Sequence, residues 1–152
     1  MEALSVRMHH VVLTVTDMDV SRQWYRELLG VEPVIDEAVE PLAGHHRGYY
    51  HVVFSLPGGL FGLHSHAATD KDDTFSEFRP GLDHVAFSAE GRSEIEAWQQ
   101  RLTELGIKHS GIVEDKYALN LSFRDPDNIA LEFWAPLNRR LSIISPEESP
   151  PL

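Results

Sequence analysis

The 152-residue chain contains no cysteine, which excludes a disulfide framework and any metal site that is built on thiolates. A metal ion would therefore have to be held by imidazole nitrogen and carboxylate oxygen. No stretch reaches the roughly 18 consecutive apolar residues that a membrane-spanning helix needs, and no basic segment precedes an apolar run at the N-terminus. We expect a cytoplasmic protein with no membrane partner.

Basic residues are scarce relative to acidic ones. The sequence has 13 lysines and arginines against 24 aspartates and glutamates, for a net charge of −11. Such a surface repels phosphate backbones, so we expect no nucleic-acid partner. The hydrophobic share of 42% is enough to bury the core of one compact domain, or of two small modules that share a core.

The first half of the chain begins with a predicted strand and helix. Residues 8–16 alternate with period two, which places His10 on the face opposite the more apolar residues. Asp17 is a typical helix N-cap and Gly30 a typical C-cap. We expect a helix over 18–29, with an apolar stripe made by Val20, Trp24 and Leu28.

The second half repeats this pattern. Residues 82–90 alternate in the same way around His84, and a helix with a predicted Ser93 and Glu96 capping box follows, ended by Gly106. The spacing from His10 to Trp24 and from His84 to Trp98 is fourteen residues in both halves. An internal repeat explains this spacing better than chance does.

Short strands are predicted after each helix, at 32–39, 49–56 and 59–66, and then at 108–114, 117–123 and 128–134. We therefore expect an α+β fold of two βαβββ modules that form a cleft between curved mixed sheets. The expected divisions are a first module at 8–66, a polar linker at 67–81, a second module at 82–136, and a tail at 137–152 outside the core.

One carboxylate lies within the last predicted strand. Alternation assigns Leu131 and Phe133 to the side that the helix covers, so Glu132 faces the other side, as His10 and His84 do. An unpaired buried carboxylate costs several kcal/mol, which a bound cation would offset. Two imidazoles and one carboxylate with open positions suit non-haem Fe(II) and related divalent metals.

Simpler explanations remain open for each of these residues. A single strand histidine is more often a hydrogen-bonded structural residue than a ligand, and Glu132 could pair with an arginine such as Arg124. The two histidines, however, occupy equivalent repeat positions, and the glutamate lies on the matching face. This combination favours a metal site.

Three phrases carry a resemblance to a known family: "HHVVLTVTDMDVSRQWYRELLG" at 9–30, "GLDHVAFS" at 81–88 and "FRDPDNIALEFW" at 123–134. The chain resembles the vicinal oxygen chelate superfamily, which includes glyoxalase I, extradiol dioxygenases, and fosfomycin and bleomycin resistance proteins. The resemblance covers about residues 8–136. It implies that His10, His84 and Glu132 hold one divalent ion, either Fe, Mn, Zn, Ni or Co, and that the protein is a homodimer acting on a small molecule.

The sequence also departs from two members of that family. Gly62 stands where the resemblance to glyoxalase I implies a fourth ligand, a glutamate, and His64 two positions along the same face is the alternative candidate. We therefore keep His64 as a tentative catalytic residue beside Glu132, while a surface histidine at the end of a strand is the simpler alternative. Val12 stands where fosfomycin resistance proteins place a threonine.

Five further residues are predicted to contact the substrate. They combine polar groups that could orient it with aromatic rings that could wall it, namely Asn120, Ser122, Trp134, Tyr50 and Phe54. Cross-strand hydrogen bonding for the polar pair and core packing for the rings are the alternatives.

The sequence predicts a metal-dependent enzyme whose substrate chelates the ion through neighbouring oxygens. A ring-cleaving dioxygenase is the first choice of reaction. Glyoxalase-like lyase, isomerase or transferase chemistry, and a metal-free protein that sequesters its ligand as bleomycin resistance proteins do, are the alternatives.

Overall fold

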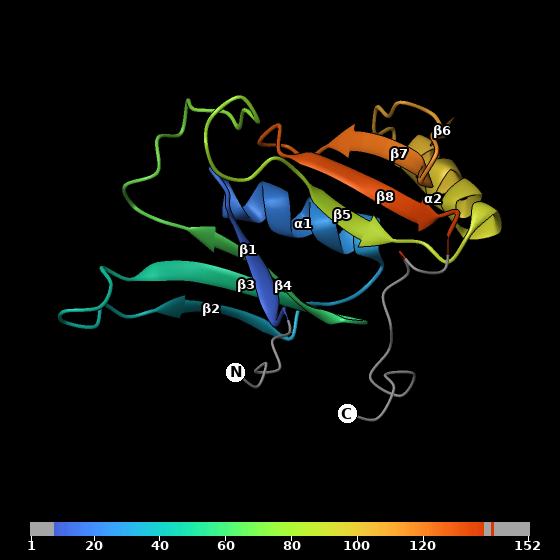
Figure 1. Cartoon of the computed structure of the whole chain (residues 1–152). Helices are drawn as coiled ribbons and strands as arrows, with labels where there is room; N and C mark the ends of the chain where they lie inside the picture. Colours follow the sequence, from blue (N-terminus) through green and yellow to red (C-terminus); the bar gives the residue numbers. More distant parts are fainter. Residues whose placement is uncertain (1–7, 139–140, 142–152) are drawn as a thin grey trace, which may run out of the picture. The chain divides into compact units, whose positions relative to one another are not determined.

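The computed structural model describes residues 8–138 and residue 141, and the chain divides into two compact units, Met1–Asp73 and Thr74–Leu152. Within the described residues, each unit contains one α-helix and one four-stranded mixed sheet (Figure 1). The expected α+β class with two βαβββ modules is therefore confirmed. Most of the expected tail at 137–152 lies outside the described residues. Neither helix in the described part of the chain is long and apolar enough to cross a membrane.

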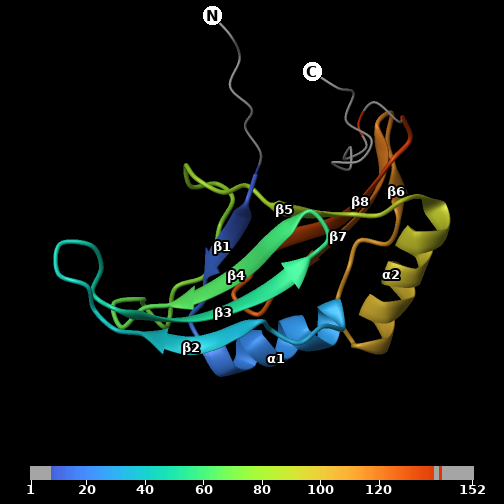
Figure 2. The same cartoon turned by 90° about the horizontal axis from the view of Figure 1, so that it is seen from below.

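Unit 1 contains β1 (His10–Thr14), α1 (Met18–Leu29), β2 (Ile35–Val39), β3 (Tyr49–Leu56) and β4 (Gly59–Ser65). The strand order is β1-β4-β3-β2, with β1 parallel to β4 and the other pairs antiparallel. In Figure 2, α1 lies along one side of this sheet. The first strand of the module thus pairs with its last strand.

Unit 2 contains β5 (Val85–Ser88), α2 (Arg92–Glu104), β6 (Val113–Glu114), β7 (Ala118–Arg124) and β8 (Ala130–Pro136). Its strand order, β5-β8-β7-β6, has the same pattern of one parallel and two antiparallel pairs. The predicted strand at 108–114 is shorter than expected, because only its last two residues pair regularly. The internal repeat is therefore a repeat of topology as well as of sequence.

Helix α1 begins and ends where the sequence predicts. The Asp17 side chain accepts hydrogen bonds from the backbone N–H groups of Asp19 and Val20, and Gly30 adopts a left-handed conformation with φ of 68°. A residue with a Cβ is disfavoured in that conformation, so glycine suits the helix end.

The buried stripe of α1 differs from the predicted one. Met18, Ser21, Tyr25 and Leu28 are buried, whereas Val20 is 51% exposed. The predicted stripe followed every fourth residue, but a helix turns every 3.6 residues, so the contact face also includes the residues three positions apart. Leu28 is the one residue that both stripes share.

The predicted capping box of α2 is wrong. The N-cap is Gly91, without a side-chain cap, and Ser93 lies within the helix. Instead, the Glu94 carboxylate accepts a hydrogen bond from the Glu90 backbone N–H at 2.6 Å. Glu94, in the first turn of α2, therefore provides an acceptor for a backbone N–H group that precedes the helix. The predicted Ser93 cap would not reach that group.

Each sheet packs its helix against one face, which we call the helix face, and we call the opposite one the far face. In unit 1, the Tyr25 ring of α1 lies 5.0 Å from the Phe61 ring of β4. In unit 2, Trp98 of α2 stacks on Phe133 of β8, with ring centroids 4.1 Å apart. These contacts fix the helix face of β4 and β8, and the alternation of buried residues identifies it in the neighbouring strands β3 and β7.

The turn before β8 is held by a buried carboxylate. Asp125, which is 6% exposed, accepts hydrogen bonds from the backbone N–H groups of Asp127 and Ile129. Asn128 follows with φ of 65°, a conformation that asparagine tolerates better than most residues. The turn sets the point at which β8 starts, and hence the register of Glu132.

Part of the predicted linker is bound to this turn. Phe75 donates its backbone N–H to the Asp127 carbonyl and accepts a hydrogen bond from the Asn128 side chain, while Arg124 pairs with Glu77 at 2.6 Å. The polar composition at 67–81 correctly predicts the lack of a helix or strand there. It does not reveal that the segment from Thr74 onward belongs to unit 2.

Replacing Asp125 by alanine should destabilise unit 2. Two buried backbone N–H groups would lose their acceptor, which we expect to lower the free energy of unfolding by about 2–4 kcal/mol. Urea denaturation of the variant measures this loss. Asp125→Asn keeps an acceptor oxygen and is the control, so equal losses in both variants would contradict this role of the carboxylate.

The Glu77–Arg124 pair should make stability depend on pH. The hydrogen bond from the Arg124 guanidinium holds the pKa of Glu77 at about 2, below its ordinary value of 4.5. Because the folded pKa is lowered, the stabilisation is full above about pH 4.5 and is lost as the pH falls toward 2. The difference in free energy of unfolding between the parent and Glu77→Gln should therefore shrink over this range. A difference that stays constant from pH 6 to pH 3 would refute the assignment.

Candidate functional site

The far face of unit 2 gathers four of the predicted site residues. Ser122 on β7 lies directly opposite Glu132 on β8, and Asn120 lies directly opposite Trp134. All four side chains point away from the helix face, because the alternating positions Leu121, Phe123, Leu131 and Phe133 form the buried core. The alternation in the sequence placed these residues correctly.

His84 is the residue just before β5, and its ring reaches Glu132. The Nε2 atom of His84 lies 3.4 Å from Oε1 of Glu132. On the other side of the ring, Nδ1 lies 2.6 Å from Oδ1 of Asp83. The imidazole thus stands between two carboxylates, and each ring nitrogen faces one of them.

Burial raises the pKa of Glu132, and the charges of Asp115 and Asp83 act in the same direction, while His84 opposes them. Glu132 does not form the ion pair with Arg124 that the sequence left open as an alternative. Arg124 instead donates to Glu77 and to the Asn128 carbonyl. A half-buried carboxylate that faces a histidine nitrogen, and that Arg124 does not neutralise, is well suited to receive a cation.

The equivalent position in unit 1 is His10, the first residue of β1. Val11 and Leu13 face the core of that unit, so His10 belongs to the far face, as predicted from the alternation. The His10 ring also contacts its preceding neighbour, with Nδ1 of His10 and Nδ1 of His9 2.9 Å apart. His10 and His84 thus occupy matching places in the two modules.

His64 lies on the same far face as His10 but at some distance along it. In the parallel pairing of β1 with β4, His10 is opposite Leu60, whereas His64 is opposite Thr14. Four residues of strand correspond to about 13 Å between the backbone positions. We therefore do not propose His64 as a ligand of an ion that His10 binds.

His64 instead belongs to a group of rings that the sequence analysis did not single out. Tyr49 stacks on His64 with centroids 4.2 Å apart. The rings of His46, His51 and His66 also lie around the Tyr49 ring. Burial, followed by the neighbouring imidazoles, lowers the pKa of His64. The alternation of β3 could have revealed this group, because Tyr49 and His51 are out of phase with the core residues.

Tyr50 and Phe54 do not lie where the predicted cleft wall requires. Phe54 is fully buried and lies opposite Phe61 on the helix face. Tyr50 has the same phase, and its hydroxyl donates a hydrogen bond to Asp36 while Arg22 of α1 lies over its ring. Both residues therefore lie on the helix face, toward α1, and not on the far face, where the predicted wall of the cleft would be.

A side chain at Gly62 would be crowded by Val12. Gly62 pairs with Val12 on β1, and a Cβ atom at Gly62 would lie 3.1 Å from a methyl group of Val12. That distance is tight for a carbon contact. The two departures noted in the sequence, at positions 12 and 62, are thus neighbours that pack against each other.

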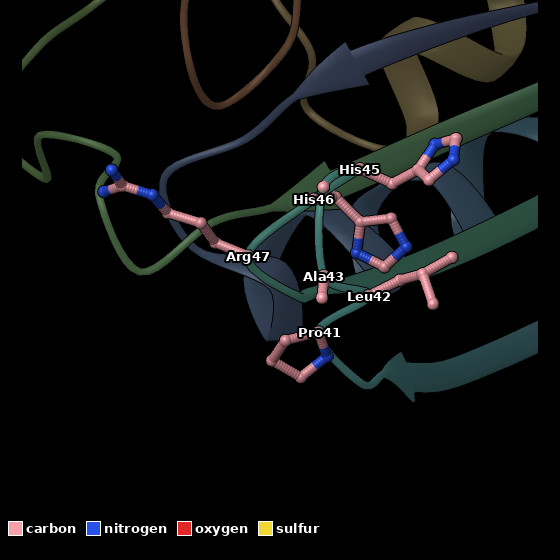
Figure 3. A pocket seen from close by; sticks show the side chains of 7 residues that line it. Pro41, Leu42, Ala43, His45, His46 and Arg47 are labelled. Carbon is pink, nitrogen blue, oxygen red and sulfur yellow. The ribbon is translucent and has the colours of Figure 1, made fainter.

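An open hollow of about 550 Å³ occurs in the connection between β2 and β3. It is lined only by consecutive residues, 41–47. In Figure 3 the side chain of Arg47 points away from those of His45 and His46, so their nitrogens do not converge. None of the predicted site residues lines this hollow, and we do not assign the site to it.

The donor atoms of unit 2 fit part of a metal site. Two ligands that each bind an ion at about 2.1 Å can lie up to about 4.2 Å apart, so the 3.4 Å between His84 and Glu132 is compatible with a shared ion. Among the described residues, no group of three or more histidine or acidic side chains is arranged to hold an ion. Unit 2 by itself therefore offers a pair of donors.

A family model for the glyoxalase/bleomycin resistance protein/dioxygenase superfamily matches residues 7–133. Among solved structures, the chain is similar to a glyoxylase/bleomycin resistance protein/dioxygenase domain from Frankia sp. EAN1pec. The identity is 34% and the TM-score 0.71, over 88% of this chain and 99% of that one. A search of curated proteins found no match.

Two more distant structures share the fold. One is a lactoylglutathione lyase from Agrobacterium tumefaciens, at 19% identity and a TM-score of 0.59, over 86% of this chain and 94% of that one. The other is a mutant of the fosfomycin resistance protein FosX from Listeria monocytogenes, complexed with Mn(II) and 1S,2S-dihydroxypropylphosphonic acid. It has 17% identity and a TM-score of 0.64, over 91% of this chain and 100% of that one. With the family model spanning most of its length, the chain belongs to the glyoxalase/bleomycin resistance protein/dioxygenase superfamily.

Proposed function

We propose that this protein is a metal-dependent enzyme of the vicinal oxygen chelate type, with His10, His84 and Glu132 as the protein ligands. The observation that carries the proposal is the His84–Glu132 pair, whose Nε2 and Oε1 atoms face each other at 3.4 Å. His10 is the matching residue of the other module. FosX, a protein of the same fold, forms a complex with Mn(II), which supports a divalent ion here.

The proposed division of roles follows from the chemistry of the side chains. A divalent ion bound here would act as a Lewis acid toward a small molecule that reaches it through two neighbouring oxygens. Glu132 supplies the negative charge of the ligand set. Ser122 and Asn120, on the same far face, can exchange hydrogen bonds with the polar groups of the substrate, and Trp134 offers an aromatic surface beside them.

Ring-cleaving dioxygenation of a catechol-like molecule is our first choice of reaction. The resemblance to glyoxalase I implies a glutamate at the position of Gly62. The proton transfer of glyoxalase chemistry needs such a base. Glycine supplies no such base, and a side chain at this position would crowd Val12. If His10, His84 and Glu132 held a divalent ion, three protein ligands would leave room for a chelating substrate, and ring cleavage would add both oxygen atoms of O2 to the ring-opened product.

We also propose that the protein is a homodimer. The two modules could complete the ligand set within one chain or between two copies. Size-exclusion chromatography with light scattering gives the mass in solution, and a monomeric mass in the presence of bound metal would require assembly within one chain.

Elemental analysis of purified protein tests the metal site directly. We expect one equivalent of a divalent metal in the parent and a large loss in His84→Ala, because His84 supplies a nitrogen ligand. His45→Ala, which removes an exposed histidine of the β2–β3 connection, is the matched control and should keep the metal. Equal metal content in the parent and in His84→Ala would exclude His84 as a ligand. Metal-free protein that binds small molecules tightly would instead favour the sequestering function.

The reaction is tested by incubating the metal-loaded protein with catechol-like compounds, with and without air. The proposal predicts that oxygen is consumed in proportion to ring cleavage. Turnover that proceeds equally well without oxygen would exclude a dioxygenase and favour lyase or isomerase chemistry.

A further inference from the structure

The residue that precedes each proposed histidine ligand contacts the Nδ1 atom of that ligand. Oδ1 of Asp83 lies 2.6 Å from Nδ1 of His84, and Nδ1 of His9 lies 2.9 Å from Nδ1 of His10. These contacts join adjacent residues, so each belongs to a single module. In both modules, the residue before the equivalent histidine therefore contacts Nδ1 of that histidine, but this residue is an aspartate in one module and a histidine in the other.

The Asp83 contact selects one tautomer of His84. Carboxylates face both ring nitrogens of His84, but Asp83 lies closer to Nδ1, at 2.6 Å, than Glu132 lies to Nε2, at 3.4 Å, so in the neutral ring the proton is favoured on Nδ1, which donates it to Asp83. In the neutral ring, Nε2 then has a free lone pair, and Nε2 is the atom that faces Glu132 at 3.4 Å. A metal ion needs that unprotonated nitrogen.

The His9 contact is less selective. Either ring of the His9–His10 pair can donate the shared proton to the other, because each neutral imidazole has one donor and one acceptor. Only the arrangement in which His10 donates leaves Nε2 of His10 free for a metal. His9 is thus compatible with the binding tautomer of His10 but does not impose it.

We propose that Asp83 is a positioning residue that fixes the metal-binding tautomer and the ring orientation of His84. His9 accepts from Nδ1 of His10 in the tautomer that leaves Nε2 free, but it does not fix that tautomer. This inference rests on the proposed function, because it assigns Nε2 of both rings to the ion. Partners of this kind behind a histidine ligand typically contribute 10–100-fold to metal affinity.

The tautomer can be measured in the metal-free protein by long-range ¹H–¹⁵N NMR of the histidine rings at pH 8, where imidazoles are mostly neutral. We expect the proton of His84 on Nδ1 in the parent and in Asp83→Asn, whose side-chain oxygen still accepts. In Asp83→Ala the proton should shift toward Nε2. Asp83 is 78% exposed, so these variants should fold as the parent does.

Zn²⁺ titration against a chelating indicator then measures affinity without any assay of activity. We expect Asp83→Ala to raise the dissociation constant by about 10–100-fold, Asp83→Asn to recover most of the loss, and His9→Ala to have a smaller effect than Asp83→Ala. Asp72→Ala, at an exposed aspartate of the segment between the modules, is the matched control and should bind as the parent does.

The outcomes separate this inference from the proposed function. If His84→Ala binds Zn²⁺ as tightly as the parent, the metal site itself is wrong. If His84→Ala loses affinity while Asp83→Ala keeps both affinity and tautomer, only the role of Asp83 is overturned. A loss in Asp83→Ala that Asp83→Asn does not recover, with an unchanged tautomer, would also overturn it.

Discussion

Glu132→Gln should lower the affinity for divalent metals by more than about 100-fold, because loss of a direct ligand costs more than the 10–100-fold typical of an outer partner. Glutamine keeps the size of the side chain but replaces an anionic oxygen by a neutral one. Its amide N–H group can also turn toward Nε2 of His84, which lies 3.4 Å from Oε1 of Glu132 in the parent. Isothermal titration with Mn²⁺ and Zn²⁺ measures the change.

Glu96→Gln makes the same chemical change on the exposed side of α2 and provides the control. It should leave both affinities unchanged. If Glu132→Gln and Glu96→Gln bind both metals as tightly as the parent, Glu132 is not a ligand, and the half-buried carboxylate needs another explanation.

Phe133→Ala should remove about 3–5 kcal/mol from the free energy of unfolding, the usual loss for a fully buried phenylalanine. The Phe133 ring contacts Trp98 of α2 at 4.1 Å, Phe123 of β7 at 5.3 Å and Phe87 of β5 at 5.7 Å between centroids. It thus joins the helix to three strands of unit 2, and its loss leaves a cavity among rings that cannot easily close it.

Urea denaturation followed by tryptophan fluorescence suits this measurement, because Trp98 lies against the substituted position. Phe133→Leu restores much of the volume and should lose markedly less stability. A loss below about 1 kcal/mol in Phe133→Ala would mean that this stack does not hold α2 on the sheet.

Period-two alternation was the most reliable guide to the fold. It correctly assigned Glu132 and Trp134 to one face of β8 and Leu131 and Phe133 to the other, because a strand buried on one side must separate its apolar residues. The helix ends of α1 followed equally well from Asp17 and Gly30, whose side chain and backbone preferences act locally.

Features that depend on contacts between elements were harder to predict. The N-terminus of α2 was misread because Glu94 reaches back to Glu90, while Ser93 merely resembles a cap. Tyr50 was considered for the substrate wall, but its phase along β3 is that of Val52, which faces the core. The pairing of Arg124 with Glu77 links residues 47 positions apart, which local pattern does not reveal.

All three ligands of the proposed site are residues that the sequence singled out, whereas the groups that surround them depend on the fold. The repeat pointed to His10 and His84 together, and the glutamate of the last strand completed the set. The role of Asp83 depends on the direction of one ring nitrogen, which a sequence does not give. The distance of His64 from His10 depends on the pairing of β1 with β4, which again requires the fold.

The most direct test of the proposed site is a crystal structure of Mn²⁺-loaded protein, with anomalous diffraction recorded to locate the ion. We predict one anomalous peak within direct bonding distance of Nε2 of His10, Nε2 of His84 and Oε1 of Glu132. These ligands would come from one chain or from two copies of it. A fully loaded crystal whose peak lies away from all three side chains, or is bound by only one of them, would contradict the proposal.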